Sequence, residues 1–170
     1  VDGKIRKKIE FDDFQKKHYV ILKKYIRVKK EILDEVKKFL KKNFQNKRVL
    51  GVHFRGTDMK TQERHPYPAT LKQITSFIDH EIKKNNYKKI FLVTEEFEYM
   101  KKLKLRYGDT ICYYNSFRSI QTDIFDNKRK NHRYLIGKEN IIDMLILSNT
   151  HSIICTQSNL ANAVTFLQIF

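Results

Sequence analysis

The fold class of this chain is decided by the stretch Val49-Leu50-Gly51-Val52-His53-Phe54-Arg55-Gly56-Thr57-Asp58. An apolar run that is broken at once by Gly56 is typical of a buried strand followed by a tight turn. Alternate side chains of a strand leave the same face, so His53 and Arg55 project together near its C-terminal end. In an open α/β sheet that end is where ligands bind, and an arginine there suits a phosphate oxygen that accepts parallel N–H bonds.

Strands and helices alternate from this stretch to the C-terminus. Apolar runs predict four strands, at 48–54, 89–94, 110–114 and 151–156. Helices are predicted from Pro68 to Asn85, up to Tyr107, at 139–148, and from the last polar turn through Phe170. This alternation predicts an α/β fold, a Rossmann-like parallel sheet with helices on both faces.

Two further segments complete the predicted organisation. An amphipathic pattern over 11–44 predicts a helical N-terminal segment, 1–46, packed on a single domain, 47–170. The stretch 115–137 is polar, basic and aperiodic, which predicts a loop that is mobile without a ligand. It carries Arg118 and Arg129.

The formal net charge is +16, and lysine supplies most of it. Pairs such as Lys41-Lys42 recur on the polar faces of the predicted helices, which is typical of solvated faces. An anionic membrane surface is a candidate partner for these faces. No arginine-rich stripe or reading motif indicates specific nucleic-acid binding, although a non-enzymatic module that binds nucleic acid or another polyanion stays the alternative function.

Other sequence features bound the class of protein. No run approaches the ~20 apolar residues that span a bilayer, and no signal peptide opens the chain, so we expect a cytoplasmic protein, with the inner membrane face as a possible peripheral site. Cys112 and Cys155 lie in strand-like runs without zinc spacing. They are predicted to be buried free thiols, and no metal site is expected.

Polar residues follow three of the four predicted strands. The first strand offers His53, Arg55, Gly56, Thr57 and Asp58, the second Thr94 and Glu95, and the fourth Thr156, Gln157, Ser158 and Asn159. Because parallel strands end at one edge, these side chains are predicted to share a crevice, with the start of the last helix as an anion site.

Each of these residues also has a structural interpretation. Ser158 or Asn159 could simply cap the last helix, and Arg55 could pair with Asp58 or a neighbouring glutamate. His53 could be a core histidine bonded to backbone. Glu95 with Glu96 could be ordinary acidity at a helix start.

Three motifs resemble one family of glycosyltransferases. The stretch from His53 to Asp58 resembles the His-x-Arg-x-Thr-Asp signature of the α-1,6-fucosyltransferases, nodulation enzymes among them, and of their protein O-fucosyltransferase relatives. Leu92-Val93-Thr94-Glu95-Glu96 is similar to the second motif of that group, an apolar strand that ends in acids. The segments 140–147 and 152–159 resemble its third motif: an aspartate-bearing helix, a strand, and a turn into the last helix.

The resemblance implies the C-terminal, nucleotide-sugar-binding domain of a GT-B enzyme that takes GDP-fucose. The implied reaction passes a hexose to a glycan hydroxyl with inversion, in cell-surface polysaccharide synthesis. Arg55 would hold the β-phosphate, with Asp58 orienting its loop, and His53 and Asp143 would lie at the guanine or ribose side. Arg55 is the implied catalytic residue that neutralises the leaving diphosphate, and the catalytic base is expected to be Glu95 or a group from elsewhere. No cofactor or metal beyond the donor is expected, because arginine and helix N-termini neutralise the diphosphate.

The chain departs from the family pattern at several positions. Glu95-Glu96 stands where an aspartate pair is commoner, Gly56 where many members have a second arginine, and Asn159 where a serine is frequent. The length of 170 residues matches one of the two Rossmann-like domains of a GT-B enzyme. The acceptor-binding half is therefore expected to be missing, much reduced or located upstream of Val1.

Overall fold

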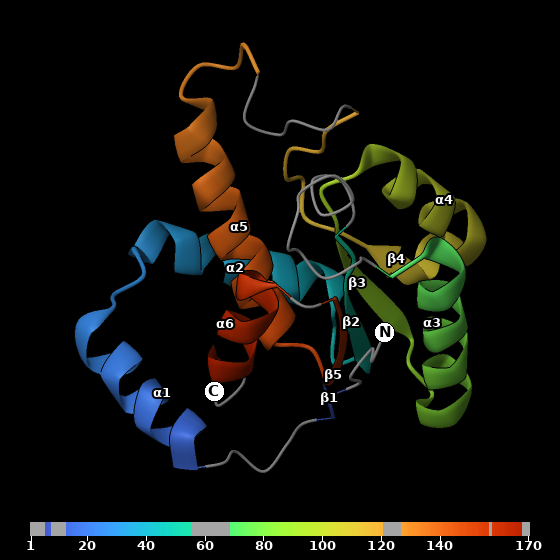
Figure 1. Cartoon of the computed structure of the whole chain (residues 1–170), viewed down its shortest axis with the longest axis horizontal. Helices are drawn as coiled ribbons and strands as arrows, with labels where there is room; N and C mark the ends of the chain where they lie inside the picture. Colours follow the sequence, from blue (N-terminus) through green and yellow to red (C-terminus); the bar gives the residue numbers. More distant parts are fainter. Residues whose placement is uncertain (1–5, 8–12, 56–68, 121–126, 157, 168–170) are drawn as a thin grey trace.

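The computed structural model describes residues 6–7, 13–55, 69–120, 127–156 and 158–167. The strands in these ranges are β1 (Arg6–Lys7), β2 (Val49–His53), β3 (Lys89–Val93), β4 (Ile111–Cys112) and β5 (Ser152–Cys155). The helices are α1 (Asp13–Tyr25), α2 (Lys30–Asn43), α3 (Leu71–Asn85), α4 (Phe97–Tyr107), the 3-10 helix η2 (Gly108–Thr110), α5 (His132–Ser148) and α6 (Asn159–Leu167). Figure 1 shows their arrangement around one sheet.

The sheet has the order β1-β5-β2-β3-β4. The four strands predicted from the sequence are the parallel ones, with Gly51 of β2 opposite both Phe91 and Ile153. The short strand β1, which the sequence pattern did not indicate, pairs antiparallel with β5 at the edge. The predicted parallel α/β fold is therefore confirmed, with one antiparallel edge strand added.

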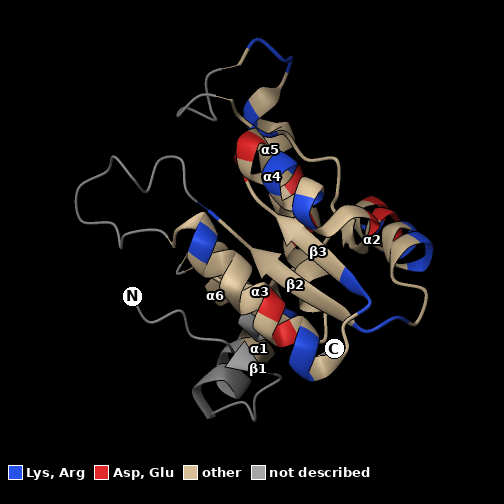
Figure 2. Cartoon of the chain, turned by 90° about the vertical axis from the view of Figure 1, so that its right-hand side faces the viewer, with Lys and Arg blue, Asp and Glu red and all other residues tan. Residues whose placement is uncertain are grey.

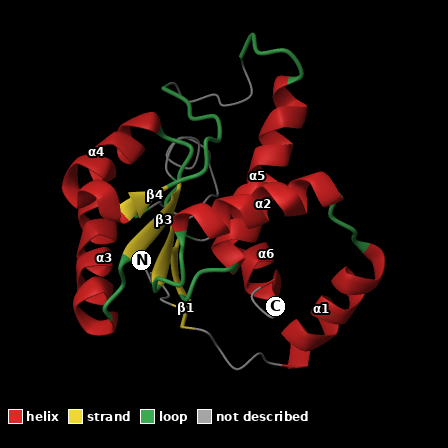
Figure 3. Cartoon of the chain, turned by 180° about the vertical axis from the view of Figure 1, so that it is seen from behind, coloured by secondary structure: helices red, strands yellow, loops and turns green. Residues whose placement is uncertain are grey.

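Helices cover both faces of the sheet, as predicted (Figure 3). Alternate residues of β2 and β3 divide between two cores, because successive side chains leave opposite faces. Val49, Phe91 and Val93 pack with α2, α5 and α6. Leu50, Val52, Ile90 and Leu92 pack with α3 and α4.

Gly51 has a packing reason to be glycine. A Cβ atom at this position would lie 2.6 Å from Thr150 Oγ1 and 3.0 Å from Leu147 Cδ2. The Thr150 hydroxyl donates to the Leu147 carbonyl at 2.7 Å, so it is held by backbone and cannot easily withdraw. The C-terminal end of α5 thus rests directly on the backbone of β2.

Replacing Gly51 by alanine is therefore expected to destabilise the fold by about 1–3 kcal/mol through overpacking. Gly137 is the matched control, because it lies exposed within α5 with no atom near its missing Cβ. Gly137→Ala should stabilise by about 0.5–1 kcal/mol through helix propensity. Urea unfolding of both variants measures the two effects, and an equal response would contradict the packing argument.

The structure corrects three predicted helix boundaries. The pattern over 11–44 forms two helices, because Lys29 takes an extended conformation (ψ 141°) that turns α2 onto the sheet. The third helix begins at Leu71 rather than Pro68, since Thr70 caps it in a capping box with Gln73. The helix predicted from Glu139 begins at His132 instead.

The two N-terminal helices differ in what they bury. On α2, Ile32 and Val36 lie in the core beside the sheet. In α1, Ile21 and Tyr25 stay exposed, and the helix lies on the outer side of α6 (Figures 1 and 3). No helix within the described ranges combines the length and the apolar character needed to cross a bilayer.

Candidate nucleotide site

The strand order places a topological switch point between β2 and β5. The chain leaves β2 toward α3, on one face, and leaves β5 toward α6, on the other face. Two neighbouring parallel strands whose connections diverge in this way leave a crevice beyond their carboxyl ends, where ligands of open α/β sheets bind. His53 lies opposite Cys155 in this pair, so the predicted residues after each strand meet here.

His53 is buried beside the start of the β5 turn. The Thr156 backbone N–H donates to the His53 carbonyl at 3.2 Å, and the Thr156 side chain is also buried. Burial lowers the pKa of His53 to about 4, with the Arg55 charge as a second cause, so the imidazole is neutral near pH 7. Neither His53 Nδ1 nor Thr156 Oγ1 has a hydrogen-bond partner among the described residues.

Arg55 and Glu95 connect the ends of β2 and β3. Arg55 Nε lies 3.3 Å from Glu95 Oε2, and both side chains remain partly accessible. The structural interpretation of Arg55, an ion pair with a neighbouring glutamate, is thus observed. The pair holds the guanidinium beyond the carboxyl ends of β2 and β3.

Asp143 is buried on α5, against the loop that follows β4. Its Oδ2 accepts a 2.6 Å hydrogen bond from Ser116 Oγ, while Oδ1 is buried with no partner within the described part of the chain. Burial raises the pKa of Asp143 to about 7, although the Ser116 bond and the Arg118 charge oppose the rise. The carboxyl therefore changes its charge in the physiological range.

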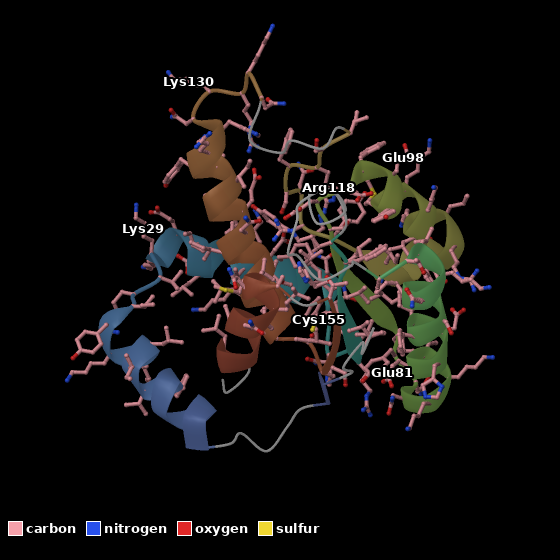
Figure 4. The ribbon with its side chains drawn as sticks, viewed as in Figure 1. Lys29, Glu81, Glu98, Arg118, Lys130 and Cys155 are labelled. Atoms are coloured by element: carbon pink, nitrogen blue, oxygen red, sulfur yellow. The ribbon has the colours of Figure 1, made fainter. Side chains whose placement is uncertain are left out.

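Arg118 was not among the predicted site residues. Its Nη1 and Nη2 donate to the carbonyls of Ser116 and Tyr114, at 2.8 and 3.0 Å, and the guanidinium lies over the Tyr113 ring. Nε is buried without a described partner. Figure 4 shows Arg118 at the end of the sheet opposite Glu81. An aperiodic loop gives no pattern that could have placed this side chain.

The predicted loop 115–137 is anchored over much of its described length. Ser119 forms an isolated bridge with Glu96, and its N–H donates to the Glu95 carbonyl at 2.8 Å. Arg129 makes a two-pronged ion pair with Glu139. The mobility of the loop stays a prediction. These contacts hold its first part against the start of α4 and its last part against α5.

The remaining predicted residues fall into two groups. Ser158 caps α6, since its Oγ accepts from the Ala161 N–H at 3.1 Å, and Asn159 is the exposed first residue of that helix. Thr94 is buried at the end of β3 and accepts a long bond, 3.3 Å, from the Glu96 N–H. Gly56, Thr57, Asp58 and Gln157 lie outside the described residues.

Four buried side-chain atoms at or beside this edge have no described hydrogen-bond partner. They are His53 Nδ1, Arg118 Nε, Asp143 Oδ1 and Thr156 Oγ1. Leaving such an atom unpaired costs about 1–3 kcal/mol, so each of the four is a candidate to bond a polar ligand. No group of three metal-ligating side chains occurs within the described ranges.

Basic residues do not concentrate at this edge. Figure 2 shows Lys and Arg distributed over several helices and at strand starts, interspersed with acids. Pairs such as Lys83-Lys84 occupy the last turns of α2 and α3, where a cation offsets the helix dipole. This distribution favours solvated faces over a polyanion groove.

The chain matches no protein-family model and no characterised protein sequence. Solved structures do resemble it. The NodZ α-1,6-fucosyltransferase co-crystallised with GDP has a TM-score of 0.62 at 17% identity, covering 85% of this chain and 44% of that one. The same enzyme soaked with GDP-fucose gives 0.63 at 17% identity, with 87% and 45% covered. The fucosyltransferase NodZ from Bradyrhizobium gives 0.61 at 17% identity, with 85% and 44% covered.

This likeness establishes the fold. The parallel sheet with its flanking helices is a fucosyltransferase-like GT-B fold, as the motif resemblance predicted. The chain spans less than half the length of these structures.

Proposed function

We propose that this chain is the donor-binding part of a fucosyltransferase-like glycosyltransferase and that its crevice binds a GDP-sugar, GDP-fucose first among them. The observation that carries the proposal is a set of buried polar atoms with no hydrogen-bond partner among the described residues: His53 Nδ1 and Thr156 Oγ1 at the ends of β2 and β5, and Arg118 Nε and Asp143 Oδ1 on the loop after β4 and on α5. Its fold is that of a fucosyltransferase whose structures were obtained with GDP and GDP-fucose, which supports the same ligand class.

Arg55 is the proposed diphosphate ligand. Arg55 follows β2, and the neighbouring strand β5 leads into the start of α6. A diphosphate bound beyond these two strand ends would meet a guanidinium and a helix N-terminus. Both groups stabilise negative charge as it develops on the leaving diphosphate. The ion pair with Glu95 orients the Arg55 guanidinium at the end of β2.

The proposed reaction is a direct displacement at the anomeric carbon. The acceptor oxygen forms a bond to C1 of the hexose as the bond from C1 to the β-phosphate oxygen breaks, and GDP leaves. The acceptor proton passes to a general base, for which Glu95 is the candidate in this chain. The proposed acceptor is a hydroxyl of a cell-surface glycan.

Calorimetric titration with GDP tests the binding half of this proposal. We expect dissociation constants between about 1 µM and 1 mM, corresponding to roughly 4–8 kcal/mol of binding free energy. UDP, ADP and short oligonucleotides serve as comparison ligands. Binding of oligonucleotides with steep salt dependence and no binding of GDP would instead favour the polyanion-binding alternative.

A further inference from the structure

The loop after β4 links three side chains into one chain of contacts. Ser116 Oγ donates to Asp143 Oδ2 at 2.6 Å, and the Ser116 carbonyl accepts from Arg118 Nη1 at 2.8 Å. Arg118 therefore fixes the backbone of the residue that holds Asp143. Its second bond, to the Tyr114 carbonyl at 3.0 Å, holds the same loop two residues earlier.

The anchoring extends to α5 itself. Glu139 lies one helical turn before Asp143, and its Oε2 accepts from the Phe117 N–H at 3.0 Å. Glu139 is in turn paired with Arg129, whose guanidinium lies over the Phe117 ring. The loop beside Asp143 is thus held to α5 by contacts within the protein.

The charges around Asp143 come from few groups. The loop contributes Arg118, and α5 contributes Glu139, which is neutralised by Arg129. Tyr114 hydrogen-bonds to Glu35 of α2, which is also paired with Lys138. The described part of α6 carries no charged side chain, and His53 of β2 is neutral near pH 7. Among the described residues, Arg118 is the cation whose charge acts on the buried carboxyl of Asp143.

We propose that Arg118 is a positioning residue of the nucleotide site, which holds Asp143 as an ionised acceptor with Oδ1 directed to a ligand N–H. This inference rests on the proposed nucleotide binding and adds the residue that makes the acceptor available. An ionised carboxylate accepts hydrogen bonds only, whereas the protonated form presents a donor to the same ligand group. Burial favours the protonated form, and the Arg118 charge opposes it.

The first measurement follows the Asp143 carboxyl directly by NMR titration of the ligand-free protein. Removing the charge in Arg118→Met is expected to raise the pKa of Asp143 by about one unit or more, the usual effect of a lost neighbouring charge. Arg118→Lys should stay close to the wild type. Ser116→Ala, which leaves Arg118 unchanged, should raise the pKa as well, because it removes a hydrogen bond to the ionised form.

The second measurement is GDP affinity between pH 5.5 and 8.5. In the wild type, affinity should rise as the pH passes through about 7, where Asp143 ionises. In Arg118→Met, the midpoint of the rise in GDP affinity should move to higher pH by as many units as the pKa of Asp143 rises in that variant. The terminal phosphate of GDP titrates in a similar range, so Asp143→Asn, which retains only that titration, supplies the reference profile.

The possible outcomes separate the two proposals. An unchanged Asp143 pKa in folded Arg118→Met and Ser116→Ala overturns the positioning role, whether or not GDP binds. Absence of GDP binding by the wild type at every pH overturns the proposed function, and with it the ligand assigned to Asp143. Parallel shifts of the pKa and the binding midpoint, with rescue by Arg118→Lys, support both.

Discussion

Replacing Arg55 by alanine is expected to weaken GDP binding at least about tenfold. A charge-assisted, two-pronged bond from guanidinium to phosphate contributes about 1.5–3 kcal/mol, and the variant also leaves the Glu95 carboxylate without its cation beside the diphosphate. Arg55→Lys should recover only part of the affinity, since an ammonium cannot reproduce the planar fork. Calorimetric titration measures both variants.

Arg106 provides the matched control for this experiment. Like Arg55, Arg106 forms an ion pair with a carboxylate, that of Asp79, but it lies in the last turn of α4, which leads to the opposite edge of the sheet. Arg106→Ala removes the same charge and should leave GDP affinity within about twofold, because exposed charges that far away are screened. Equal affinity in Arg55→Ala and the wild type, with an intact fold by circular dichroism, would show that Arg55 is only a structural ion pair.

Asp143→Asn is expected to stabilise the ligand-free protein while it impairs binding. The pKa of Asp143 in the folded state is raised to about 7 by burial, above its usual value near 3.8. The stability contributed by such a group is complete below about pH 4 and is lost as the pH rises through 7. The variant should therefore gain of order 2 kcal/mol over the wild type at pH 8, and less at pH 5.

Urea unfolding at the two pH values measures this gain, and titration with GDP measures the loss of affinity, which we expect to be tenfold or more. Asp79→Asn is the control, for which the expected change in stability has the opposite sign. Burial raises the pKa of Asp79, but hydrogen bonds from Arg106 and Tyr107 outweigh it, and the net pKa is lowered. That variant should lose stability at pH 8. A loss of stability in Asp143→Asn at pH 8 would contradict the account of this carboxyl.

Much of the fold followed from local pattern. The apolar runs around Leu50, Ile90 and Ile153 predicted parallel strands, because a strand that is buried on both faces needs apolar residues at nearly every position. Helix ends were predicted where a residue type tolerates the positive φ that other residues avoid. Asn86 and Gly108 both take positive φ at the ends of α3 and α4.

The pattern failed where tertiary contacts decide the local structure. The N-terminal stretch has one amphipathic period. Of its two helices, α2 packs its apolar residues into the core beside the sheet, whereas Val20 and Ile21 of α1 remain exposed. The first turns of α5 were predicted as loop because His132 and Gly137 interrupt the apolar period. Arg129, Phe117 and Glu139 make contacts beside these turns that no local pattern encodes.

The sequence by itself determined which strand ends carry polar side chains, since alternation and a following turn place His53, Arg55 and Thr156 without knowledge of the rest of the chain. Only the tertiary structure decided which of these side chains are charged and which are already engaged in an ion pair. Burial leaves His53 neutral, an ion pair occupies Arg55, and Arg118 arrives beside Asp143 through a loop. Burial and charge depend on what packs around a group from distant parts of the chain, and that information is absent from any short stretch of sequence.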